Sequence, residues 1–218
     1  MLKKIFSLGS IILLVFAISA CGNDEEEEIL NPSRGIWEDD TFISEYLGLE
    51  FELPEHWSAL DDKETAEFFG LVFDDAAPAM GVEIPEEILD ALEDGQLHDM
   101  FAIHPLGGTN VQIIFERSPL AMLISEEEYI EAAIEEFEEL NSMDVGMEFR
   151  DFEVASETTT IGNYEWESLS LMMEMGLGIE AASYTFINIQ GPNIRQITIS
   201  ILGDETVDDI LDAFSTIN

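Results

Sequence analysis

The chain has very few basic side chains and a single cysteine. Lysine and arginine together number 7, against 48 aspartate and glutamate residues, and the formal charge at pH 7 is −41. A field of this sign repels phosphate backbones and anionic lipid headgroups, which excludes nucleic acid as a partner. One cysteine cannot form an internal disulfide, so the folded part must be held together by its own core.

The long apolar run of this sequence lies at its beginning. Lys3 and Lys4 precede a mainly apolar stretch over residues 5–17, and the small residues Ser19 and Ala20 follow before Cys21. This is the three-part layout of an export signal that is cleaved from the mature protein. The run is also shorter than the ~20 apolar residues that a permanent membrane-spanning helix needs.

Residues 18–21 read Ile-Ser-Ala-Cys, and this segment resembles the lipobox of bacterial lipoproteins. In that family an aliphatic residue stands three positions before a cysteine that becomes the lipidated first residue. The resemblance implies a diacylglycerol thioether on Cys21 and, in many bacteria, a further acyl chain on its amine. Because two acyl chains anchor stably where one binds only marginally, the protein is expected on the outer, extracytoplasmic face of the cell membrane.

The sequence divides into three parts. Residues 1–20 are the expected signal, residues 21–35 are the lipidated cysteine with an acidic tether, and residues 36–218 are a single domain. The tether contains four consecutive glutamates, which repel one another and keep it extended. A hydrophobic content of 46% is sufficient for a buried core in the domain.

The acidity has two interpretations. Loss of Lys3 and Lys4 with the signal would take the formal charge from −41 to −43. Because the carboxylates are spread along the whole chain, we favour adaptation of the surface to a saline or alkaline exterior, where charge keeps proteins soluble. The alternative is a site for cations or cationic ligands, which requires carboxylates that gather in one cleft.

The pattern over residues 36–218 predicts an α+β fold with a single antiparallel β-sheet and helices packed on it. Strands joined by Gly, Asn and Pro turns, with no helical crossover, must pair antiparallel. A capping box from Ser125 to Glu128 starts a helix that ends near Leu140. Further helices are expected from Asp61 or Asp62, from Pro85, and at the C-terminus after a cap at Asp204. The principal expected strands are 41–44, 49–53, 97–104, 110–117, 147–155, 164–175, 179–190 and 194–202.

Residues 46–57 form an amphipathic strand that ends at Pro54 and is followed by Trp57. This segment, with the order of the later elements, resembles the PsbP/Mog1-like superfamily and related lipoproteins of Gram-positive bacteria. The resemblance extends roughly from Trp37 to Ile217. It implies accessory and scaffolding roles, and it carries no functional residue over to this chain.

Candidate metal ligands are few or poorly spaced. His98 and His104 could share one face of a strand, with Asp99 or Glu116 as a further zinc ligand, but Pro105 follows at once and surface histidines explain the pattern better. The third histidine is His56. A copper(I) site could use methionines, but Met173 and Met175 are better explained as core residues of a strand. The other methionines considered are Met143, Met147 and Met172, and the acidic doublets Asp61-Asp62, Asp74-Asp75 and Asp208-Asp209 lack the spacing of a calcium loop.

The sequence contains no nucleophile elbow, phosphate loop, zinc-protease helix or serine-lysine pair. We therefore expect no enzyme, no catalytic residue, no cofactor and no specific metal site, with cations binding only nonspecifically. The favoured function is a non-enzymatic binding or accessory domain that engages an envelope protein or a ligand. The alternative is a low-affinity cation- or solute-binding lipoprotein, and an envelope hydrolase comes third.

If the acidity is environmental, thermal stability should increase with monovalent salt, because screening weakens the repulsion between carboxylates. Thermal unfolding in dilute buffer and in molar sodium chloride measures this effect. An unchanged melting temperature would contradict the environmental interpretation.

Overall fold

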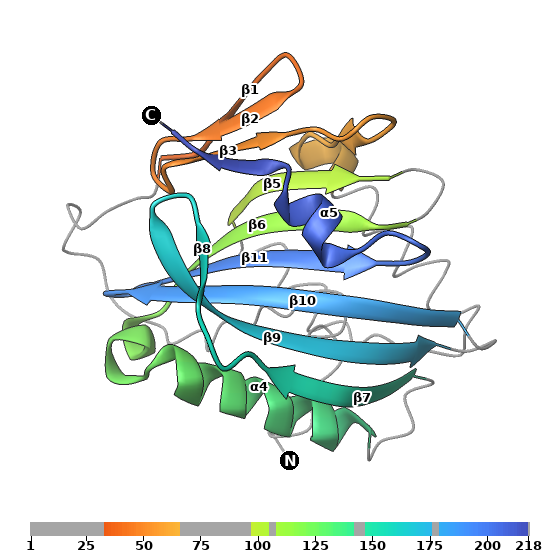
Figure 1. The fold of residues 1–218 in the computed structure, drawn as a ribbon. Coiled ribbons are helices and arrows are strands. Elements are labelled where there is room, and N and C mark those ends of the chain that lie inside the picture. The colour runs from red at the N-terminus through yellow and green to blue at the C-terminus, as the bar shows by residue number, and fades with distance from the viewer. Residues whose placement is uncertain (1–32, 66–96, 105–107, 142–146, 176–178, 218) are drawn as a thin grey trace.

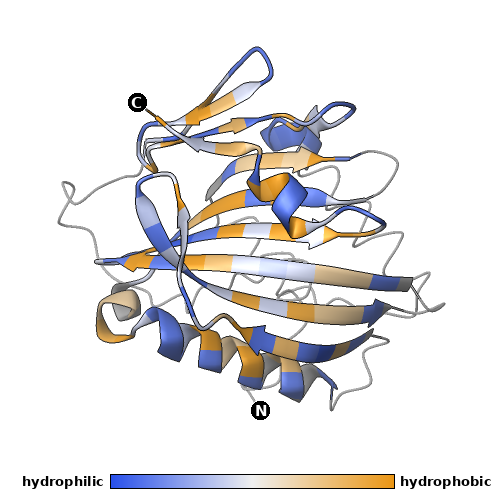
Figure 2. Cartoon of the chain, viewed as in Figure 1, coloured by the Kyte–Doolittle hydropathy of each residue, from blue (hydrophilic) through white to orange (hydrophobic). Residues whose placement is uncertain are grey.

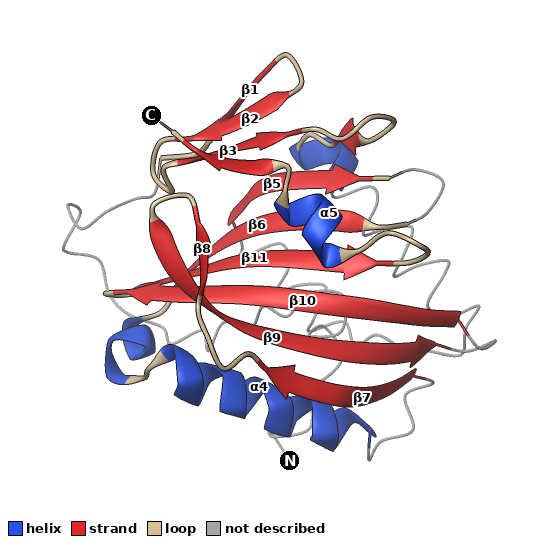
Figure 3. Ribbon diagram, in the orientation of Figure 1, coloured by secondary structure: helices blue, strands red, loops and turns tan. Residues whose placement is uncertain are grey.

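The computed structural model describes residues 33–65, 97–104, 108–141, 147–175 and 179–217, and these form a mostly antiparallel β structure with few helices (Figure 3). The expected signal, Cys21 and the helix expected from Pro85 lie outside the described residues. Among the described residues, no helix is long and apolar enough to cross a membrane. Asp61 and Glu64 exchange capping hydrogen bonds at the start of a helical segment over residues 62–65, as predicted.

The larger sheet has eight strands and contains the six long strands that the sequence predicted between residues 97 and 202 (Figure 1). Strand β6 (Asn110–Arg117) pairs antiparallel with β11 (Asn193–Ile201), although the two strands are far apart in the sequence. The long strands begin and end within one residue of the predicted bounds. In spatial order the strands are β4 (Ser58–Ala59), β5 (Leu97–Ile103), β6 (Asn110–Arg117), β11 (Asn193–Ile201), β10 (Ile179–Gln190), β9 (Tyr164–Met175) and β7 (Met147–Val154), with β8 (Thr159–Ile161) paired to β9.

A second sheet of four strands corrects the prediction of a single sheet. Its order is β1 (Ile36–Glu38), β2 (Thr41–Ser44), β3 (Leu49–Glu52) and β12 (Phe214–Thr216). Phe42, Leu49 and Phe51 are completely buried against the larger sheet. Short turns let β1, β2 and β3 pair locally, and their apolar face then packs on the larger sheet instead of extending it.

The C-terminus also differs from the expected terminal helix. Helix α5 (Val207–Leu211) is only five residues long, and its cap is Thr206 rather than Asp204. Thr206 and Asp209 form a reciprocal capping box. After α5 the chain becomes strand β12, in which Phe214 pairs with Phe51, and the two rings lie 4.8 Å apart. Pairing with the free edge of β3 satisfies backbone groups that a longer helix would have left at this edge.

The two faces of the larger sheet carry separate cores. One face, covered by the smaller sheet and α5, buries Trp166 together with Ile197, Ile199 and Ile201 of β11. The other face packs against helix α4 (Glu126–Asn141), which follows the 3-10 helix η4 (Pro119–Leu123). The predicted capping box of α4 is present, with Ser125 and Glu128 bonded to each other. Figure 2 shows hydrophobic and hydrophilic residues alternating along α4, as expected for a helix with one buried face.

The turn between β2 and β3 contacts the turn between β8 and β9, and this contact joins the two sheets. The backbone N–H of Asn163, in the turn between β8 and β9, donates to the carbonyl of Leu47 at 3.2 Å. Gly162 has φ +61°, and a Cβ there would lie 2.7 Å from the Leu47 oxygen and 2.8 Å from the Leu49 Cβ. Glycine is therefore required at position 162 both by the backbone angle and by the close approach of the other sheet.

We expect Gly162→Ala to destabilise the protein more than Gly191→Ala. Both glycines have φ near +60°, but nothing lies within 4 Å of a Cβ at Gly191. The left-handed backbone penalises both variants by ~1–2 kcal/mol, and crowding adds about 1–3 kcal/mol at Gly162 alone. Urea unfolding of the two variants measures the difference, and equal losses would contradict this account of the contact.

Candidate functional site

A buried arginine lies where the two sheets meet. Arg195 on β11 is 1% exposed, and its guanidinium carbon lies 4.6 Å from the ring centre of Tyr46 and 4.2 Å from that of Tyr164. Its Nε and Nη2 donate to the Tyr46 hydroxyl at 3.3 and 3.0 Å, Nη1 donates to Asn188 Oδ1 at 3.1 Å, and Nη2 donates to Gln190 Oε1. Arg195 forms no ion pair with any carboxylate of the described chain.

Beside this arginine, an open pocket of about 550 Å³ lies between the start of α4, the segment before β8 and the start of β9. Its lining is strongly polar, with three carboxylates, two amides, a hydroxyl and one aromatic ring. The lining residues are Glu126, Thr158, Asn163, Tyr164, Glu165, Glu167 and Asn188.

Several lining residues are held in place by hydrogen bonds. Asn188 accepts from Arg195 and donates through Nδ2 to the Glu165 carbonyl at 3.1 Å, so both ends of its amide are fixed. Glu126 Oε1 accepts from the Ile189 N–H at 2.9 Å, which ties the first turn of α4 to β10. Tyr164 stacks on the guanidinium of Arg195. The wall formed by Tyr164, Asn188 and Glu126 is therefore ordered before any ligand binds.

Sequence reasoning missed this pocket. Its carboxylates come from a helix start and from the first residues of β9, which are far apart along the chain. Among 48 acidic residues, no local signal distinguishes Glu126, Glu165 and Glu167 from the others. Only the pairing of β9 with β10 and the docking of α4 bring them to one end of the sheet.

The structure describes several of the predicted metal candidates, and these do not form a group of metal ligands. His56 is exposed beside Glu55, and His104 lies near Trp57, with ring centres 6.2 Å apart. Met173 is buried in the core beside α4. The side chains of His98 and Met175 lie outside the described part, and the described residues contain no group of three or more His, Cys, Asp or Glu side chains able to hold a metal.

Two acids named as possible zinc ligands are buried. Asp99 accepts from the Gly35 N–H at 2.8 Å, and its burial raises its pKa to about 6 against the opposing effects of this bond and of Arg34. Burial raises the pKa of Glu116 to about 7. Both carboxyl groups therefore favour the neutral form more than exposed acids do.

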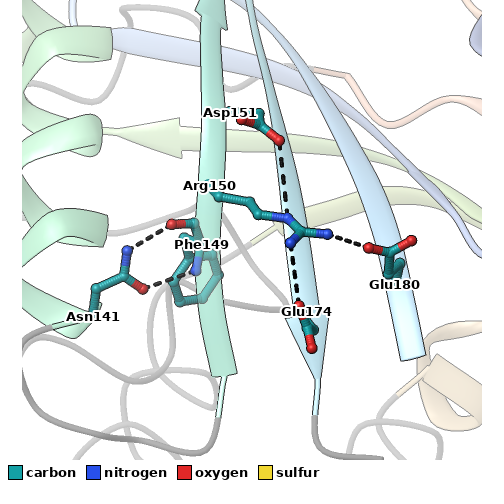
Figure 4. Close-up of polar contacts among 6 residues, drawn as sticks. All are labelled: Asn141, Phe149, Arg150, Asp151, Glu174 and Glu180. Atoms are coloured by element: carbon teal, nitrogen blue, oxygen red, sulfur yellow. Dashed lines mark hydrogen bonds and ion pairs between the residues drawn. The ribbon is translucent and has the colours of Figure 1, made fainter. Parts of the chain in front are cut away.

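Figure 4 shows a cluster of ion pairs around a second arginine, Arg150 on β7. Arg150 pairs with Glu174 at 3.2 Å, with Glu180 and, at 3.9 Å, with Asp151. Asn141, at the end of α4, donates to the Phe149 carbonyl and accepts from its N–H, at 2.6 and 2.8 Å. Because exposed ion pairs each contribute only ~0–1 kcal/mol, we assign this cluster to joining strand ends rather than to binding.

No family model matches the chain, and comparison with curated proteins gave no match. Among solved structures, the chain is similar to PsbP (CyanoP) of Synechocystis, with 12% identity, a TM-score of 0.41, and coverage of 91% of this chain and 98% of that one. It is also similar to LpqN of Mycobacterium tuberculosis, a protein involved in cell envelope biogenesis, with 13% identity, a TM-score of 0.39 and 76% of each chain covered.

A third similar structure is a protein of Bacteroides thetaiotaomicron, with 9% identity and a TM-score of 0.38 over 78% of this chain. The present chain spans 45% of the length of that protein. At these identities the similarity concerns the arrangement of the chain.

Glu116 should make stability depend on pH. Between its ordinary pKa of 4.5 and its folded pKa of about 7, the folded state holds a proton that the unfolded state releases, so stability decreases as pH rises through this window. We expect Glu116→Gln to remove this dependence and to stabilise the protein by up to ~3 kcal/mol at mildly alkaline pH. Thermal unfolding as a function of pH checks this, with exposed Glu148→Gln as the control. Destabilisation by Glu116→Gln in alkaline buffer would contradict the assignment.

Proposed function

We propose that this chain is a lipid-anchored extracytoplasmic protein whose folded domain binds a ligand without catalysis. We further propose that the open pocket beside Tyr164 takes a small organic cation. Support for the anchor comes from Ile18–Cys21, which match the lipobox. Support for the ligand comes from the pocket, where three glutamates gather as the cation-binding alternative requires.

An organic cation fits this pocket better than a metal ion does. A volume of about 550 Å³ is many times that of an ion and falls in the range of small-molecule sites, about 300–1,000 Å³. The described chain offers no compact group of metal ligands. Carboxylate and amide oxygens spread over a pocket wall suit a molecule with several ammonium N–H donors, which form strong charge-assisted bonds with carboxylates. The charge of −41 attracts such a ligand over long range.

A second function, as an accessory domain for an envelope protein, is favoured by one surface feature. Met122, Leu123 and Ile124, at the end of η4, are 62%, 76% and 37% exposed. Three consecutive exposed apolar residues are unusual on so acidic a surface and are typical of a contact with another protein. Ile124 stands two residues before Glu126, which lines the pocket, so this contact would be made beside the pocket.

Amine binding can be tested by thermal unfolding of the full chain in detergent. We expect putrescine or spermidine to raise the melting temperature beyond sodium and calcium chloride at matched ionic strength. The gain corresponds to ~2.7 kcal/mol at a hundredfold excess over Kd. Glu165→Gln with Glu167→Gln should abolish this gain. The matched control is Glu148→Gln with Glu153→Gln, both on exposed positions of β7. Two results would reject the pocket as the site: an equal shift in melting temperature with the amines and with every salt, or an equal loss of the amine-induced gain in both double variants.

The anchor has a separate test. Cys21→Ser should abolish incorporation of labelled palmitate in growing cells and move the protein from the membrane to the soluble fraction, because no acyl chain remains to bind the bilayer. Ser19→Ala keeps a small residue at its position and serves as the control. Labelling that persists in the Cys21→Ser protein would refute lipidation at this residue.

A further inference from the structure

The pairing between β9 and β10 ends before the two strands do. The last paired positions are Ile187 and Glu167, whereas β10 continues to Gln190 and β9 begins at Tyr164. In this part β9 pairs with β8 on its other side. Figure 1 shows β8 and the start of β9 curving away from β10 toward the smaller sheet. The two strands therefore form a fork at this end of the larger sheet.

Backbone groups on the two sides of this fork point toward each other. Two-residue turns join β10 to β11 and β8 to β9, and the residues that flank such a turn form a hydrogen-bonded pair. Gln190 flanks the first turn and Tyr164 flanks the second, so their backbone groups point away from the fork. Successive residues direct these groups to opposite sides of a strand. The N–H of Ile189 and the C=O of Glu165 thus point into the fork and would form the next rung of the ladder.

Two side chains bond these backbone groups instead. Glu126, at the start of α4, accepts from the Ile189 N–H at 2.9 Å, and Asn188 donates through Nδ2 to the Glu165 carbonyl at 3.1 Å. Two hydrogen bonds, one of them to a carboxylate, thus replace a single neutral one, which favours the open fork. Glu126, Asn188 and Glu165 all line the open pocket. The fork is therefore part of the pocket.

We propose that this fork is a latch that sets whether the pocket is open, with Glu126 and Asn188 as the positioning residues that hold it open. When Glu126 releases Ile189, the N–H of Ile189 bonds to the C=O of Glu165, and the strands close to the ~4.8 Å spacing of a sheet. Closure removes the space between the strands, so an amine binds the open form alone. The latch follows from the strand register, whereas its link to amine binding rests on the function proposed for the pocket.

Two substitutions at Glu126 separate the latch from the charge of this side chain. Glu126→Gln keeps an oxygen acceptor for Ile189 and loses the charge, whereas Glu126→Ala loses both. The measurements are amide hydrogen exchange of Ile189 by NMR and calorimetric titration with spermidine, both on the full chain in detergent. Glu127→Ala removes a neighbouring exposed carboxylate of α4 and should leave both values unchanged.

We expect Ile189 in the Glu126→Ala protein to exchange within about threefold of its rate in the unchanged protein, because Glu165 replaces the lost acceptor. Spermidine should bind the Glu126→Ala protein on the order of tenfold more weakly than the Glu126→Gln protein, since the closed form competes with binding.

Two results would overturn the latch. One is exchange of Ile189 that is about tenfold faster or more in the Glu126→Ala protein, which shows an N–H bonded only to water. The other is equal spermidine affinity in the Glu126→Ala and Glu126→Gln proteins, which shows that only the charge matters. If the unchanged protein binds no spermidine, the function proposed for the pocket fails, and the exchange rate of Ile189 alone decides the latch.

Discussion

The guanidinium of Arg195 connects the turn between β2 and β3 with the wall of the open pocket. Removing a charge from water is costly by several kcal/mol, and here four hydrogen bonds to neutral groups and two aromatic faces offset that cost. Tyr46 belongs to the turn between β2 and β3, whereas Tyr164 and Asn188 belong to the larger sheet and line the pocket. The position of the smaller sheet and the order of the pocket wall therefore depend on the same buried cation.

The distribution of the few cations defines where the negative field is unopposed. Arg34 pairs with Asp62, and Arg150 is surrounded by carboxylates at the far end of β7 and β9. Arg195 is buried away from solvent. The residues that line the pocket include three glutamates and no basic side chain. A surface acidity that the sequence spreads evenly thus becomes locally concentrated through folding.

Much of the secondary structure could be predicted because its signals are local. The capping box of α4 lies within four residues, and the turn at Gly162-Asn163 joins strands whose alternation is visible in the sequence. The prediction of a single sheet was wrong, and the predicted terminal helix ends before Phe214, for a common reason. Periodicity shows which residues of a strand are buried, but it does not show which other element covers them. The pairing of Phe214 with Phe51 joins residues far apart in the chain, so no local pattern predicts it.

The sequence by itself determined the charge and the positions of most strands, and it predicted an export signal and a lipobox, because each of these depends on neighbouring residues. Only the tertiary structure decided that β1–β3 and β12 form a second sheet, that Glu126, Glu165 and Glu167 share a pocket, and that β9 and β10 separate at a fork. Strand order and helix docking bring these residues together. Both depend on how apolar faces pack against one another, which no local sequence pattern encodes.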